Sequence, residues 1–414
     1  MWRRYLVRAV LALLVLFILG FSSSTPVRPG TVAGVAIPHL YSLPGWELRN
    51  FWGKWLFGLE LRFRGGTPPR QEAKAKVQEF FRLGDELGAA QADLDRATAT
   101  SDQAARKRAQ VRASALQSQR DVLQPYVEAT LEGEIKRVLA EEGIVSRVGP
   151  WRTVWPPVDF TFTVPPFILA VSPRERIELQ DTLLLSSDLS LERQESVEAG
   201  VEKLGLSAVT EQVGGVATYP SIIPRVVSLQ DALNIAAHEW VHQYLFFHPL
   251  GRAYGASPEM TTVNETLADL AGREIGRLAL RGLFPETAPP GPPPAPAQEQ
   301  AAAPPSPETF DFSREMRVTR LAAEEMLSNG QVEAAEAYMR QRQQFLAEHG
   351  YYIRKLNQAY FAWHGTYADT PGSVSPVGGL LERFRQRSPS LGAFVREAAA
   401  VGSYEAFLEM VGQQ

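Results

Sequence analysis

The residues most able to perform chemistry form the pattern HExxH, which begins at His238 and ends at His242. Residues four apart on a helix are displaced by about 40° around its axis, so both imidazoles project from one face, as two nitrogen ligands of one Zn²⁺ require. Glu239 lies about 100° round from His238, where it can accept a proton from an attacking water without binding the metal. The pattern therefore predicts a zinc-dependent hydrolytic site with Glu239 as its general base.

A catalytic zinc site needs a third protein ligand, and a second predicted helix offers two candidates. Glu265 and Asp269 lie four residues apart in the run NETLAD, within a helix predicted over Pro258–Leu283. They share one face of that helix. One carboxylate can therefore bind the metal while the other accepts a hydrogen bond from a ligand histidine and holds its tautomer.

The two motifs together, HEWVH and NETLAD, resemble the HExxH…NExxxD arrangement of the thermolysin-like metallopeptidases, the gluzincins. The resemblance covers about 35 residues around the two motifs. It implies a zincin fold that hydrolyses bonds in a peptide or protein substrate. It also implies a role for each matching residue: His238, His242 and Glu265 as zinc ligands, Glu239 as general base, and Asp269 as the group that orients a ligand histidine.

His248 is a rival third ligand, because it follows His242 at the spacing of the metzincin pattern HExxHxxGxxH. In that pattern a glycine turns the chain so that the third histidine returns to the metal. Leu245 stands at the glycine position here and favours a helix that continues, which would point His248 away from His242. A metzincin-type site that uses His248 therefore stays an alternative.

Amide hydrolysis also needs a hydrogen-bond donor for the oxyanion beside the metal, usually a tyrosine or a histidine. Candidates lie in a polar and aromatic run in a predicted C-terminal helix, where Tyr360, His364 and Tyr367 stand at i, i+4 and i+7 and would share a face. Packing alone would also explain such a stripe, and Tyr254 is a further candidate. If His364 or Tyr367 is catalytic, the C-terminal helices must fold back over the metal site.

The elements around these motifs predict an α+β fold with a zincin-like core, made of a small sheet and the active-site helices. Residues 151–224 contain short β-rich runs, including an edge strand at Val213–Tyr219 against which an extended substrate could pair. The active-site helices are expected at Leu229–Phe247 and Pro258–Leu283, and a helical hairpin is expected between Gln71 and Gly143.

The amino end predicts a single membrane helix. Three arginines precede an uncharged run from Ala9 to Phe21, which is short for a spanning helix and also compatible with a cleaved signal peptide. The basic cluster predicts a cytoplasmic amino terminus and an extracytoplasmic catalytic domain at the cell membrane, or a secreted protein if the segment is cleaved.

The predicted organisation is a membrane segment over 1–24, a mainly helical membrane-proximal region over 25–150, the zincin catalytic core over 151–284, a Pro- and Ala-rich spacer over 285–308, and a C-terminal helical region over 309–414 that could complete the site.

Composition excludes several classes of function. The 42 Lys and Arg residues against 46 Asp and Glu residues give a net charge of −4, which argues against a basic nucleic-acid-binding protein. Because the chain has no cysteine, a transition metal must be held by His, Asp or Glu. Two alternatives stay open: a metal-dependent hydrolase that acts on another bond, and an inactive zincin-like scaffold, tethered to the membrane, that presents the helical hairpin as its interaction surface.

Overall fold

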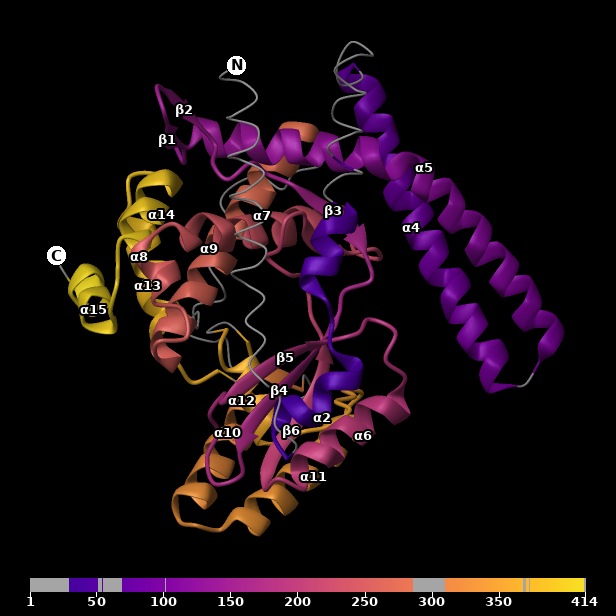
Figure 1. The fold of residues 1–414 in the computed structure, drawn as a ribbon, viewed down its shortest axis with the longest axis vertical. Helices are drawn as coiled ribbons and strands as arrows, with labels where there is room; N and C mark the ends of the chain where they lie inside the picture. Colours follow the sequence, from indigo (N-terminus) through magenta and orange to yellow (C-terminus); the bar gives the residue numbers. More distant parts are fainter. Residues whose placement is uncertain are drawn as a thin grey trace, which may run out of the picture.

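The computed structural model of the 414-residue chain describes residues 30–50, 54, 69–100, 102–285, 310–367, 370–371 and 373–412. Within these residues 64% are helical, in 14 helices, and the strands form three small sheets (Figure 1). The predicted α+β fold is therefore wrong, and the described molecule is predominantly helical. The reason is that the β-rich runs form strands of three to seven residues, whereas the longest helix has 39 residues.

The predicted membrane helix is also corrected. In the part of the chain that the structure describes, none of the helices combines the length and the apolar character needed to cross a membrane. The single-pass anchor and the cell-membrane location derived from it are therefore not supported. The segment 1–24, to which the prediction referred, lies outside the described residues, as does almost all of the predicted spacer over 285–308.

A long helical hairpin extends away from the rest of the molecule (Figure 1). It consists of α4 (Arg70–Ala99) and α5 (Gln103–Glu141), which occupy the span for which the sequence predicts a hairpin. The buried Arg120 attaches α5 to its surroundings, because its guanidinium donates hydrogen bonds to the carbonyl oxygens of Phe80 (3.2 Å) and Arg225 (2.8 Å). The hairpin is therefore fixed to the loop that precedes the helix beginning at Leu229.

The main sheet is antiparallel, and helices cover both of its faces. Alternation along its central strand places Leu169 and Val171 in one apolar cluster with the helix α6, and Ala170 in another cluster with the helix α12. The described sheets are β5-β4-β6, the hairpin β1-β2 and the parallel pair β3-β7. Their strands are β1 (Ser146–Val148), β2 (Trp151–Thr153), β3 (Phe160–Thr163), β4 (Phe167–Pro173), β5 (Asp181–Leu185), β6 (Leu206–Gln212) and β7 (Ser221–Pro224), while α6 is Leu191–Glu202 and α12 is Gln358–His364.

The predicted edge strand at Val213–Tyr219 is wrong. The chain leaves β6 at Gln212 and forms a loop, in which Val216 makes only an isolated bridge to Ile222 of β7. Gly214, Gly215 and Pro220 disfavour a regular strand here, although the alternation of residue types in this run predicts one.

The N-terminal segment 30–50 packs on the sheet and on α6. It contains α2 (Val32–Ala36) and the 3₁₀ helix η1 (Ile37–His39). The Tyr41 N–H donates to the Leu184 carbonyl (2.9 Å), and the Ser186 N–H donates to the His39 carbonyl (2.8 Å). Residues 39–41 therefore lie along the edge of β5, and a helical stretch over 43–50 completes the segment.

The largest apolar core surrounds the helix pair α7 (Leu229–Phe246) and α9 (Pro258–Leu283), which match the predicted active-site helices. Trp240 of α7 is buried there, and its indole N–H donates to the Pro156 carbonyl (2.8 Å). C-terminal helices lie beside α9, opposite the hairpin, and a separate helix pair lies near the main sheet (Figure 1). The remaining helices are α8 (Pro249–Arg252), α10 (Phe312–Ser328), α11 (Val332–Glu348), α13 (Val377–Arg387), α14 (Leu391–Ala399) and α15 (Tyr404–Gly412).

Candidate metal centre

Three predicted ligands converge between α7 and α9. The Nε2 atoms of His238 and His242 are 3.0 Å apart, and Glu265 Oε2 lies 3.3 Å from His242 Nε2 and 3.7 Å from His238 Nε2. The side chain of Glu265 is 8% exposed and the imidazoles are 15% and 17% exposed. His238, His242 and Glu265 thus form a group that could hold a metal ion.

The distances fit a tetrahedral ion. With metal–nitrogen and metal–oxygen bonds of about 2.0–2.2 Å, two ligands of a tetrahedral Zn²⁺ lie about 3.4 Å apart. The three observed separations, from 3.0 to 3.7 Å, bracket this value. Glu265 Oε2 is buried, and among the described residues it accepts no hydrogen bond of ordinary geometry. A cation would satisfy this oxygen.

The imidazole of His242 is oriented by Asn264. Its Nδ1–H donates to Asn264 Oδ1 (2.9 Å), so Nε2 is the nitrogen that faces the position of a metal. The Asn264 amide donates in turn to the Leu250 carbonyl (3.4 Å), which sets the direction of its oxygen. Asp269, predicted to orient a ligand histidine, forms an ion pair with Arg273 at 2.6 Å. The role of Asp269 towards a histidine stays a prediction.

Two glycines of α9 allow the close approach of the ligand helices. A Cβ at Gly272 would lie 2.9 Å from His238 Cα and 3.0 Å from the Asn234 carbonyl oxygen, and a Cβ at Gly276 would lie 3.0 Å from Asn234 Cα. Only glycine lets the backbones meet at this distance without displacement. In the sequence, the signal for this close approach is a pair of glycines four residues apart within a helix.

Glu239 lies beneath the loop that follows β6. It is 6% exposed, and Gly215 of that loop lies so close that a Cβ there would overlap with Glu239 Oε1. Gly214, by contrast, has open space where a Cβ would stand. The carboxylate of the predicted general base is therefore held between α7 and the backbone of one glycine.

The charges of the site favour a cation. Burial opposes protonation of His242, but the facing Glu265 carboxylate outweighs it and raises the pKa of His242 to about 9. Burial also acts to raise the pKa of Glu265, and His242 reverses this and lowers it to about 2. Burial raises the pKa of Glu239 to about 8, with Glu265 adding to the effect. A cation bound beside Glu239 would oppose these effects and favour the ionised carboxylate, which is the form that can accept a proton.

Two tyrosines approach Glu265 from separate segments. The hydroxyl of Tyr254, in the turn between α8 and α9, donates to Glu265 Oε1 (2.8 Å). Tyr367 follows α12, and its ring centroid lies 6.4 Å from that of His238. Burial, together with Glu265, raises the pKa of both phenols, so both stay protonated and can donate hydrogen bonds. The C-terminal region therefore reaches the group formed by His238, His242 and Glu265, here called the metal group.

The structure separates His364 from Tyr367. The helix α12 ends at His364, so the expected common face with Tyr367 does not exist. The His364 ring packs on Tyr360 (centroids 4.2 Å apart), and its Nε2 lies 3.8 Å from Glu211 Oε2 on β6. The contacts of His364 are therefore with the main sheet.

His248 points away from the predicted ligands. The helix α7 ends at Phe246, two residues before His248, although Leu245 favoured a continuing helix. The His248 ring packs on Tyr244 (centroids 4.2 Å apart), and its Nδ1–H donates to the Tyr244 carbonyl (2.8 Å). These contacts do not favour the metzincin alternative.

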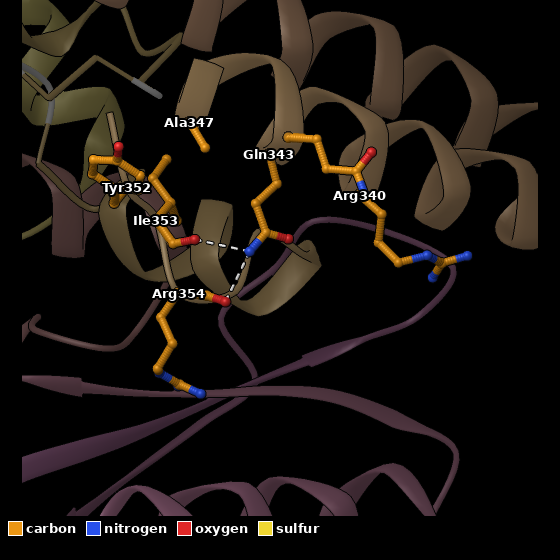
Figure 2. A pocket seen from close by; sticks show the side chains of 7 residues that line it. Arg340, Gln343, Ala347, Tyr352, Ile353 and Arg354 are labelled. Atoms are coloured by element: carbon orange, nitrogen blue, oxygen red, sulfur yellow. Dashed lines mark hydrogen bonds between the residues drawn. The ribbon is translucent and has the colours of Figure 1, made fainter. Parts of the chain in front are cut away.

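A pocket of about 570 Å³ lies elsewhere, between α11 and the segment that follows it (Figure 2). The Gln343 amide crosses it and donates to the carbonyl oxygens of Ile353 and Arg354, at 2.8 Å each. None of its lining residues belongs to the metal group, and Arg354 is already paired with Glu198. The pocket is therefore separate from the candidate centre.

Comparison with protein-family models, with curated proteins and with solved structures finds no match for this chain. The candidate centre therefore depends on the geometry described above and on the resemblance of its two motifs.

Proposed function

We propose that this protein is a zinc-dependent metallopeptidase with His238, His242 and Glu265 as the zinc ligands and Glu239 as the general base. The observation that carries the proposal is the convergence of three ligand atoms within 4.8 Å of one another, next to a buried carboxylate on the same helix. Two imidazoles and one carboxylate are a typical ligand set for catalytic zinc, and they leave a fourth position for water.

The residues around the metal group would divide the work of amide hydrolysis. A bound Zn²⁺ would supply a water of lowered pKa and polarise the carbonyl of the scissile bond. Glu239, as a carboxylate beside the bound ion, would take the proton of the attacking water and pass it to the leaving amine. Tyr254 and Tyr367 are the nearest phenols and would donate hydrogen bonds to the carbonyl oxygen as it becomes negative.

The loop above Glu239 supports a peptide as the substrate. Among the described residues, the peptide groups of Gly214 and Gly215 make no backbone hydrogen bond, and Gly214 is exposed. Peptide groups left unpaired beside a catalytic base can pair with the backbone of an extended substrate. The pairing edge would then be this loop, in place of the strand that the sequence predicted.

The test compares wild-type protein with Glu239→Gln and, as a matched control, with Glu259→Gln, which changes an exposed glutamate at the start of α9. We expect one zinc per chain in all three proteins, hydrolysis of labelled casein by the wild type and the control, and its loss in Glu239→Gln and on treatment with a chelator. Hydrolysis by Glu239→Gln, or a wild type that binds no zinc, would contradict the proposal.

A further inference from the structure

The loop Gly214–Ser221, here called the roof loop, links the catalytic base to the N-terminal segment. At its near end Gly215 lies against Glu239 Oε1. Behind this contact Val216 and Ile222 exchange two backbone hydrogen bonds (3.1 and 3.0 Å), and the Thr218 N–H donates to the Val216 carbonyl (2.8 Å). Gly215 is therefore linked to Thr218 through its neighbour Val216.

Two side chains hold the far end of the roof loop. Gln243 of α7 donates to the Thr218 carbonyl (2.6 Å) and to Ser221 Oγ (2.8 Å). From the other side, Glu47 Oε1 accepts the Thr218 hydroxyl (2.6 Å) and the Tyr219 N–H (3.4 Å). Gln243 belongs to α7 itself, so of these two side chains Glu47 is the one that comes from outside that helix.

Glu47 lies in the N-terminal segment 30–50, which has its own attachments far from the metal group. In α2, Ala36 is fully buried, and Val35 packs so closely on α6 that a Cβ at Gly200 would lie 2.6 Å from Val35 Cγ1. Leu40 forms a bridge to Leu185 at the edge of β5. The place of Glu47 is therefore set by the docking of this segment on the sheet.

We propose that Glu47 is a positioning residue for the general base, and that it acts through Thr218 and the roof loop. The inference rests on the proposed function, because it assigns a consequence to the placement of Glu239. The N-terminal segment then controls the site. When it is docked, Gly215 confines the Glu239 carboxylate. When it is displaced, the roof loop loses the hydrogen bonds to Glu47 and keeps those to Gln243, Ile222 and Asp159. Displacements of about 1 Å near reacting groups can lower rates strongly.

The acceptor oxygen of Glu47 provides a conservative variant. Glu47→Gln keeps an oxygen for the Thr218 hydroxyl and the Tyr219 N–H, whereas Glu47→Ala removes it. Thr218→Val removes the hydroxyl at nearly constant volume. Leu48→Ala changes an exposed neighbour (49% exposed) in the same segment and is the matched control.

The experiment measures zinc content, casein hydrolysis and amide exchange of the peptide 213–224 in the full chain. For Glu47→Ala we expect one zinc per chain, a kcat lower by about tenfold with KM little changed, and faster exchange of the roof loop. Glu47→Gln and Leu48→Ala should resemble the wild type. The double variant Glu47→Ala/Thr218→Val should lose no more activity than Glu47→Ala alone, because Glu47→Ala already breaks the hydrogen bond that Thr218→Val removes.

Two results would overturn the inference while the proposed function stands: wild-type kcat in Glu47→Ala when Glu239→Gln is inactive, or additive losses in the double variant. Loss of zinc or of folded protein in Glu47→Ala would assign Glu47 a structural role instead. An inactive wild type would overturn the proposed function and, with it, this inference.

Discussion

At the scale of single residues, the two oxygens of Glu265 have different partners. Oε1 accepts the Tyr254 hydroxyl, while Oε2 faces the two imidazoles. The carboxylate is thus held in one orientation before any ion arrives, which lowers the entropic cost of binding. The sequence could indicate Glu265 through its motif, but Tyr254 precedes it in a turn that has no motif of its own. Only the folded chain identifies Tyr254 as its partner.

Tyr254→Phe should therefore weaken metal binding without removing any ligand. We expect the zinc dissociation constant to rise by about tenfold, because hydrogen-bond partners of metal ligands typically contribute this much. Competition with a chromophoric chelator measures the change. Tyr352→Phe, which alters a tyrosine 86% exposed, should leave the constant as it is. Equal affinities for Tyr254→Phe and wild type would show that this hydrogen bond does not support the site.

Gly215→Ala tests whether the loop backbone confines the base. The new Cβ would overlap with Glu239 Oε1, so either the carboxylate or the loop must move. We expect kcat to fall by about a hundredfold with zinc still bound, since Glu239 is not a ligand. Gly214→Ala is the neighbouring control, because its Cβ would enter open space. If the two variants kept the same kcat, the proposed confinement of Glu239 would be wrong.

At the scale of elements, sequence patterns located the helices that carry the ligands but did not show how they meet. The helical period led to bounds within one residue of those of α7 and α9. The same reasoning failed at Val213–Tyr219, since alternation in the sequence cannot show whether a neighbouring strand is there to pair with it. The short distance between α7 and α9 depends on Gly272 and Gly276. Because glycine counts as neither polar nor apolar in a helical pattern, the pattern could not predict this distance.

Gly272→Ala should separate the ligand helices. Its Cβ would lie 2.9 Å from both the Cα and the N of His238, and backbone atoms cannot move aside cheaply. We expect the free energy of unfolding to fall by about 2 kcal/mol, as for other overpacked cores, together with weaker zinc binding. Denaturant unfolding checks the first effect and chelator competition the second.

Gly133→Ala is the matched control for this change, because Gly133 lies within α5 and its Cβ would meet nothing within 4 Å. Alanine has a higher helix propensity than glycine, so Gly133→Ala should raise the free energy of unfolding by about 0.5–1 kcal/mol. A stabilising effect of Gly272→Ala as well would mean that α7 and α9 are not closely packed in solution.

At the scale of the whole molecule, the site depends on segments that the sequence presents as separate regions. Glu47 comes from the N-terminal segment, and Tyr367 comes from beyond the Pro-rich stretch, yet both approach elements of the metal group. The domain boundaries predicted from composition could not show this, because composition reports where a segment is apolar or polar but not where it docks. Long-range pairs such as Arg174 with Glu336 (2.7 Å) and Arg354 with Glu198 hold the C-terminal region on the sheet.

Glu198 carries the most buried of these contacts, at 2% exposed. It accepts hydrogen bonds from the Thr210 N–H (2.7 Å) and from Lys355 Nζ (3.1 Å), and it pairs with Arg354. Burial acts to raise its pKa, but these partners outweigh burial and hold the pKa of Glu198 below its ordinary value. A carboxylate whose pKa is lower in the folded chain stabilises it above the unfolded pKa, and this contribution is lost as the pH falls through the folded pKa.

Glu198→Gln should accordingly destabilise the protein in a pH-dependent way. Near pH 7 we expect the free energy of unfolding to fall by about 2 kcal/mol, because the change leaves two cations beside a neutral amide. The difference from wild type should shrink as the pH falls below about 4.5, where the unfolded carboxylate takes up its proton. Denaturant titrations between pH 7 and pH 3 measure it. Glu195→Gln, an exposed position on the same helix, should differ from wild type by less than about 0.5 kcal/mol throughout. A difference for Glu198→Gln that is constant over this range would show that the folded protein does not hold Glu198 as a charged group.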